Sequence, residues 1–333
     1  MKEDNVDKIY VYFACFNDSE VCPTISNCIL SADQPENLVF GIYFQYTEDH
    51  TKYAFKDFIT QFDNEFRVHY EHITEDNIQD LIGLAKGRIK SYAMCEDEEY
   101  KMLIDGHMMF ADGWDTKIKN KHKIADDRGI IKPIINGYAG LYYFDDEGNR
   151  VPHFRDELTN LRYQYFVVDD ENDIHQKMMR FNWHDRLPTH VMTDQNPTGD
   201  EIIPNVRFSG NFSFSRYNLV EHLPEWVIFE DEEMPWTINL FDAGFNFVFP
   251  LFDEPTIMHL YMGREPFDVQ STRDQIEFLY PDYKSLQQQK YDNISNYLDN
   301  PNNYDKIIKY QNYAKVKILS GKTIDRYVPI NFR

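Results

Sequence analysis

Asp105 and His107 are the residues whose types and spacing most directly suggest chemistry. They follow Met102–Ile104, a short apolar run that is typical of a buried strand. Gly106 lies between them and permits a sharp turn or a close backbone approach. Side chains two positions apart project to the same side of an extended backbone, so this carboxylate and imidazole could share a divalent cation. An isolated Asp-x-His is more often a polar turn with a hydrogen-bonded histidine, so the surrounding elements decide between the two interpretations.

The segments before Asp105 alternate between strand and helix patterns. Strands are predicted at 9–14, 38–46, 66–72 and 102–104, and helices at 23–30, 55–62 and 78–94. This order predicts an α/β fold with a parallel sheet flanked by helices. Ligands of such sheets bind outside the carboxyl ends of the strands. Asn17, Asp18, Asp105 and His107 are all expected at such ends, which makes this edge the predicted site.

The later part of the chain adds strands, a helix and a long irregular segment. Residues 208–214 alternate strictly and predict a strand beside the site, in which Gly210 would allow close ligand approach. A hairpin turn is predicted at 145–149, a helix at 235–244 and a strand at 245–252. Residues 151–206 have weak periodicity, as in a substrate-binding loop or an unrecognised strand region. We predict one domain over 1–265 and a small helical C-terminal appendage over 266–333.

Composition limits the class of protein. The chain has 333 residues, of which 42% are hydrophobic and 16% aromatic, so a large core is available. Acidic residues outnumber basic ones 56 to 34, and the net charge of -22 argues against nucleic acid or an anionic membrane as a partner. The four cysteines show no paired metal-ligand spacing and no disulfide framework, and no apolar run reaches membrane-spanning length. We therefore expect a cytoplasmic protein, in the host cytoplasm if the sequence is viral.

Several short motifs occur in a characteristic order. They are Cys22-Pro23-Thr24-Ile25, Gly83 with Arg88, Asp105-Gly106-His107-Met108, Gly113-Trp114-Asp115, Glu232-Glu233 and His259-Leu260-Tyr261. This ordered set resembles the hydroxyproline-directed polypeptide N-acetylglucosaminyltransferases and, more distantly, the mucin-type polypeptide GalNAc-transferases. The resemblance runs in patches from Ile9 to Tyr261 and leaves the tail uncovered.

The resemblance implies a retaining, metal-dependent glycosyltransferase with a GT-A-like fold, that is, a Rossmann-like, mixed, mainly parallel sheet flanked by helices. It implies transfer of GlcNAc from UDP-GlcNAc to a hydroxyl acceptor, either protein hydroxyproline, Ser or Thr, or a glycan. Asp105, His107 and His259 would hold Mn²⁺ or Mg²⁺, since a mixed carboxylate–imidazole set suits Mn²⁺ better than Ca²⁺. Glu232 and Glu233 are the candidate catalytic residues, expected to position the sugar or the acceptor. The candidate cofactor-binding residues are Asp18, Gly83, Arg88, Asp105 and Gly210.

Each of these roles has a simpler alternative. Arg88 could be an exposed helix charge instead of a phosphate ligand. His259 could be a core histidine. Glu232 and Glu233 lie in an acidic run that could be a solvated turn.

Two other functions remain open at this stage. One is a glycosyltransferase that uses another UDP-sugar, and the other is a noncatalytic sugar- or protein-binding module. Asn17, Gly106 and Asp231 replace an arginine, a serine and a glycine of the resembled pattern, which keeps the module open as an alternative. The presence of all three candidate metal ligands favours the enzyme.

Overall fold

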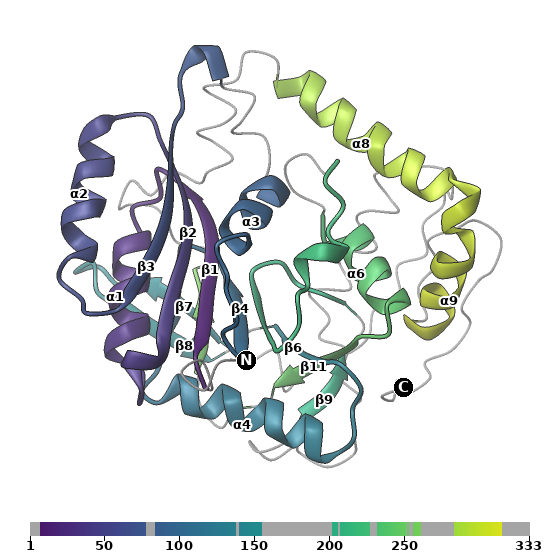
Figure 1. Cartoon of the computed structure of the whole chain (residues 1–333), viewed down its shortest axis with the longest axis horizontal. Coiled ribbons are helices and arrows are strands. Elements are labelled where there is room, and N and C mark those ends of the chain that lie inside the picture. The colour runs from purple at the N-terminus through teal and green to yellow at the C-terminus, as the bar shows by residue number, and fades with distance from the viewer. Residues whose placement is uncertain are drawn as a thin grey trace.

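The computed structural model describes residues 7–77, 84–137, 140–154, 202–205, 207–226, 232–250, 252, 256–260 and 283–314. Within these residues the chain forms an eight-stranded main sheet, a four-stranded small sheet and flanking helices (Figure 1). The main sheet, in sheet order, consists of β3 (Glu65–His72), β2 (Leu38–Tyr46), β1 (Ile9–Phe16), β4 (Tyr100–Ile104), β10 (Phe212–Ser215), β6 (Pro133–Asn136), β11 (Asn246–Pro250) and β9 (Ile202–Asn205). The small sheet, in the same sense, consists of β5 (Met108–Phe110), β12 (Ile257–His259), β7 (Gly140–Phe144) and β8 (Arg150–Phe154). The α-helices are α1 (Val21–Leu30), α2 (Asp49–Ile59), α3 (Leu84–Tyr92), α4 (Trp114–Asp127), α6 (Glu233–Asp242), α8 (Tyr283–Asp299) and α9 (Tyr304–Ala314).

The first part of the chain confirms the predicted alternation of strands and helices. β1 pairs in parallel with both β2 and β4, and β2 pairs in parallel with β3. β10 is antiparallel to β4 and β6, while β11 is parallel to β6. The sheet is therefore mixed but mainly parallel, as the α/β prediction requires.

Helices cover both faces of the main sheet. Ile9, Val11 and Phe13 of β1 join the core under α1, α2 and α4. Tyr10 and Tyr12 point the other way and join the core with α3, α6, α8 and α9. Because both faces of the sheet are covered, the central strand β1 is apolar along its whole length, which explains its unbroken hydrophobic sequence.

The predicted strand over 208–214 is shorter in the structure, where β10 begins at Phe212. The buried side chain of Asn136 replaces the strand ladder before this point. Asn136 Nδ2 donates to the carbonyls of Ser209 and Phe212, at 2.9 and 2.6 Å, and its Oδ1 accepts from the Ser209 amide at 2.7 Å. The alternating pattern was correct, but side-chain hydrogen bonds satisfy this backbone in place of a neighbouring strand.

The strands on either side of Asn136-Gly137 belong to different sheets. β6 lies in the main sheet and β7 in the small one. The hairpin turn at 145–149 is confirmed, since β7 and β8 pair antiparallel across it. Asp145 Oδ1 accepts hydrogen bonds from the amides of Glu147 and Asn149 and stabilises this turn.

The Gly-Trp-Asp motif joins α4 to the end of α1. Trp114 Nε1 donates to the Cys28 carbonyl at 2.8 Å. The buried Asp115 carboxylate accepts from the amides of Asp33 and Gln34, at 2.8 and 3.0 Å. The motif therefore stabilises the fold through hydrogen bonds to backbone that would otherwise be unsatisfied.

The C-terminal helices α8 and α9 share a core with α6, which confirms the helical prediction within the described residues 283–314. The predicted boundary at 265 and most of the irregular segment 151–206 lie outside the described residues. Among the residues that are described, no helix combines the length and apolar character that a membrane crossing needs.

Candidate metal centre and its surroundings

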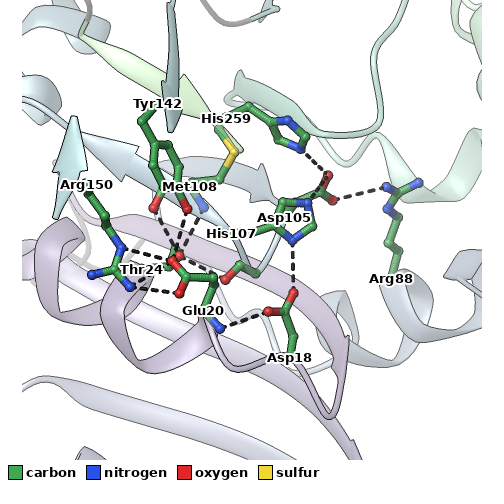
Figure 2. A network of polar contacts seen from close by, with 11 residues as sticks. Asp18, Glu20, Thr24, Arg88, Asp105, His107, Met108, Tyr142, Arg150 and His259 are labelled. Atoms are coloured by element: carbon green, nitrogen blue, oxygen red, sulfur yellow. Dashed lines mark hydrogen bonds and ion pairs between the residues drawn. The ribbon is translucent and has the colours of Figure 1, made fainter. Parts of the chain in front are cut away.

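Asp105, His107 and His259 converge at the carboxyl ends of the main-sheet strands (Figure 2). One potential ligand atom from each lies within 4.8 Å of the others. His259 Nε2 is 3.2 Å and His107 Nε2 is 3.9 Å from the same atom, Asp105 Oδ2. The structure thus brings together the three residues that the sequence analysis grouped, although His259 is 154 positions from Asp105.

The small sheet brings His259 to this place. β12 pairs antiparallel with β5, which directly follows His107, and His259 is opposite Met108. The Leu260 amide donates to the His107 carbonyl at 3.2 Å and extends this pairing to the site. His259 is therefore buried beside Asp105 and His107 and not only within the apolar core.

Asp105 is surrounded by groups that favour its ionised form. Burial alone raises its pKa, but the hydrogen bond with His259 and the attraction of His107, His259 and Arg88 outweigh burial and lower the pKa to about 2. Arg88 Nη2 lies 3.8 Å from Asp105 Oδ1. Asp105 is therefore a carboxylate at neutral pH, which is the form that ligates metals.

The donor set matches a transition-metal site. It offers one carboxylate oxygen and two imidazole nitrogens, a combination that differs from the all-oxygen shell preferred by Ca²⁺. Three protein ligands leave room in an octahedral shell for water and phosphate oxygens. The residues present therefore fit Mn²⁺ with an additional oxygen-bearing ligand.

Arg88 is buried and paired, so it is not the exposed helix charge that the sequence left open. Its side chain is 3% exposed and forms an ion pair with Glu232. Its Nη2 donates to the Gly210 carbonyl at 2.7 Å. The guanidinium is thus held beside Asp105 by partners from two distant segments.

Glu232 and Glu233 do not form a solvated acidic turn, which corrects that alternative. Glu232 is 4% exposed and pairs with Arg88. Glu233 pairs with Arg207, and its Oε1 accepts from the Gly210 amide at 2.7 Å. The sequence shows the acidic run, but the two arginines that neutralise it come from distant positions.

Arg207 was missed in the sequence analysis. One basic residue before an aromatic strand is too common a pattern to indicate a role. Its buried side chain gains significance only from its contact with Glu233.

The structure gives Gly210 a different explanation from the one predicted. A Cβ at this position would lie 2.7 Å from Arg88 Nη1 and 2.9 Å from Glu232 Oε1. The absent side chain therefore makes room for the ion pair. Close approach of a ligand to Gly210 stays a prediction.

Asp18 lies behind His107, on the side away from Asp105 (Figure 2). Its Oδ2 is 2.9 Å from His107 Nδ1, and its Oδ1 accepts from the Glu20 amide at 2.9 Å. A direct contact of Asp18 with a cofactor stays a prediction. Gly83, the remaining cofactor-binding candidate, lies outside the described residues.

Asn17 occupies a position for which its residue type is suited. Its φ of 44° is in the left-handed region, which asparagine tolerates better than most residues. Its side chain bridges to Thr47 through hydrogen bonds of 3.0 and 3.3 Å and ties the ends of β1 and β2 together. The replacement of the arginine in the resembled pattern therefore has a local structural reason.

The mixed, mainly parallel sheet with flanking helices agrees with the predicted GT-A-like fold, and a family match gives the class of protein. Residues 60–312, more than half of the chain, match the family model Glycosyltransferase (GlcNAc). The protein belongs to this GlcNAc glycosyltransferase family. The match also extends through α8 and into α9, beyond the region covered by the resemblance seen in the sequence.

Two solved structures are similar to the chain. Residues 1–349 of TarS from S. aureus share 11% identity at a TM-score of 0.42, covering 91% of this chain and 78% of that one. The mannosyltransferase PcManGT from Pyrobaculum calidifontis, in complex with GDP-Man and Mn²⁺, shares 12% identity at a TM-score of 0.44, covering 92% of this chain and 75% of that one. No curated protein matches the sequence.

Proposed function

We propose that the protein transfers GlcNAc from UDP-GlcNAc to a hydroxyl acceptor with retention, using Mn²⁺, or Mg²⁺, held by Asp105, His107 and His259. The observation that carries this proposal is the convergence of these side chains at the strand ends. The family match supports the sugar, and the sequence resemblance supports UDP as the nucleotide and retention as the outcome.

A bound divalent cation would neutralise charge that develops on a diphosphate leaving group. Asp105 provides the ionised carboxylate of the ligand set. Arg88 provides a fixed positive charge, since Glu232 and the Gly210 carbonyl hold its guanidinium within 3.8 Å of Asp105. A guanidinium in this position is suited to phosphate oxygens.

Glu232 and Glu233 have two possible contributions in this proposal. Through Arg88 and Arg207 they hold the backbone around Gly210 at the edge of the site. Their predicted contact with the sugar or the acceptor would add to this role. Glu233 is the better candidate for such a contact because its side chain is 18% exposed, compared with 5% for Glu232.

We propose a protein hydroxyl, such as that of hydroxyproline, as the first acceptor to test and the cytoplasm as the location. The acceptor follows from the sequence resemblance. The location is supported by the four free cysteines, as expected in a reducing compartment.

The test is UDP release from a panel of UDP-sugars with Mn²⁺, with and without hydroxyproline-containing peptides. We expect UDP-GlcNAc to be consumed fastest and NMR of the product to show a retained anomeric configuration. Faster consumption of another UDP-sugar would overturn the donor assignment. No consumption of any donor by folded protein would favour the noncatalytic module.

A further inference from the structure

We infer that the turn containing Asp18 and Glu20 positions the two histidines of the metal centre: Asp18 orients His107, and Glu20 fixes the small sheet that carries His259. The inference rests on the proposed metal-dependent function. Neither residue belongs to the ligand set, and Asp18 was expected to contact the nucleotide instead.

The first half of the inference comes from the contact between Asp18 and His107. The carboxylate of Asp18 can only accept a hydrogen bond, and it lies 2.9 Å from His107 Nδ1. The proton of the neutral ring is therefore placed on Nδ1, which leaves a lone pair on Nε2. Nε2 is the atom that faces Asp105. A carboxylate behind a ligating histidine fixes both the tautomer and the orientation of the ring.

Gly106 makes this contact possible. A Cβ at position 106 would lie 3.2 Å from Asp18 Oδ2 and 2.9 Å from Cγ2 of Val21, a stiff and buried side chain. Asp18 therefore occupies space that a side chain at 106 would restrict. This explains why glycine stands where the resembled pattern has serine.

The second half of the inference comes from an ion pair that joins the start of α1 to the small sheet and has a buried carboxylate. Glu20 is 5% exposed and sits before α1, whereas Arg150 and Tyr142 belong to the small sheet. Arg150 Nε donates to Glu20 Oε2 at 2.9 Å and its Nη2 to Oε1 at 2.8 Å, a bidentate arrangement. The Tyr142 hydroxyl donates to Glu20 Oε2 at 3.2 Å.

This ion pair affects His259 through the strand order. β8 carries Arg150, β7 carries Tyr142, and β7 pairs directly with β12, where Leu141 is opposite His259. The Glu20 amide also donates to Asp18, so both residues belong to one short turn (Figure 2). Within this turn, Asp18 contacts His107, and Glu20 contacts the small sheet that carries His259. Displacement of this turn would move two ligands relative to Asp105.

The test measures Mn²⁺ alone, by electron paramagnetic resonance of the free ion, in Asp18→Asn and Glu20→Gln proteins. We expect each variant to bind Mn²⁺ about 10- to 100-fold more weakly while remaining folded, as is usual for the partners of metal ligands. Arg150→Lys keeps the charge but loses the bidentate geometry, and it serves as the second variant if Glu20→Gln does not fold.

The matched control is Glu98→Gln. Glu98 is 1% exposed and forms an ion pair with Arg67, whose Nη2 lies 2.8 Å from Glu98 Oε1, near the amino end of β4. This variant also disrupts a buried pair, so it should lose stability without losing Mn²⁺ affinity. If Glu98→Gln lost as much Mn²⁺ affinity as Glu20→Gln, general destabilisation would explain both losses. That result would overturn the positioning role of Glu20.

A second measurement needs no metal. The ¹⁵N shifts of the His107 ring should show a proton on Nδ1 in the wild type and a tautomer mixture in Asp18→Ala. An unchanged tautomer together with unchanged Mn²⁺ affinity would overturn the role of Asp18. If wild type binds no Mn²⁺ while the tautomer still responds, the proposed function fails but Asp18 keeps its role in orienting His107.

Discussion

The two ends of the parallel strands β1 and β4 both carry charged side chains, but the charges are arranged differently. At the amino ends, Arg67 pairs with Glu98 at 2.8 Å and Arg216 pairs with Glu99 at 3.0 Å, and each pair joins neighbouring segments. At the carboxyl ends, two histidines approach one oxygen of Asp105. Paired opposite charges hold two segments together, whereas converging ligand atoms can bind a cation. The arrangement of the charges therefore says more about function than their number does.

The largest expected effect of a substitution is at Asp105. Asp105→Ala should lower Mn²⁺-dependent UDP affinity and transfer by at least about a hundredfold, since a ligand contributes more than its outer-shell partners. His259→Ala should act in the same direction. Calorimetry with UDP and Mn²⁺ measures the affinity, and Glu98→Gln is the control at the amino ends. UDP affinity equal to wild type in both folded variants would rule out the ligand set.

The next comparison is between the two kinds of ion pair. Arg88→Met leaves the buried Glu232 without its cation, so the free energy of unfolding should fall by about 3–5 kcal/mol. Arg216→Met removes a side chain that is 41% exposed and should cost about 0–1 kcal/mol. Urea denaturation measures both. Similar losses would mean that burial does not distinguish the two pairs.

Glu233 tests whether the carboxyl-end ion pairs contribute beyond folding. If Glu233 holds the sugar or the acceptor, Glu233→Gln should cost about 1.5–3 kcal/mol in kcat/KM, or roughly tenfold to over a hundredfold. The pair with Arg207 means that stability must be measured alongside turnover. Transfer that falls only in proportion to the folded fraction would remove Glu233 from the catalytic residues.

Gly106 tests how tightly the carboxyl-end site is packed, because a side chain added there would meet Val21 and Asp18. Gly106→Ser should destabilise the protein by about 1–3 kcal/mol through overpacking against Val21 and should shift Asp18 away from His107. The control is Gly129→Asn, since Gly129 has a φ of 71°, which asparagine tolerates, and no atom near the added Cβ. Thermal unfolding should separate the two variants, and equal stability would contradict the packing argument.

The smallest effect is a pH dependence at the amino ends. Burial lowers the pKa of His122 below its usual range, and the attraction of Asp126 only partly opposes this. The unfolded chain therefore binds a proton more readily, and stability is lost as the pH falls from about 6.5 toward the lower folded pKa. His122→Gln should reduce the loss of Tm between pH 7.5 and 5.5. An identical pH profile would show that His122 does not contribute.

Local sequence patterns predicted much of the fold and part of the site. The alternation of strands and helices up to Asp105 depends on neighbouring residues, and it predicted the parallel pairing that β1, β2, β3 and β4 show. The order of these strands in the sheet was not predicted. The division of β6 and β7 between two sheets was not predictable in this way. It depends on which strand each one meets in space.

The sequence by itself determined that Asp105 and His107 stand together at a strand end, because both belong to one short turn. Only the tertiary structure decided the partners that give this turn its chemistry. His259 arrives through the small sheet, Arg88 is buried against Glu232, and Glu20 meets Arg150 across 130 positions. Such contacts leave no periodic or spacing signal in the chain, because their energy comes from burial and charge compensation between segments that meet only after folding.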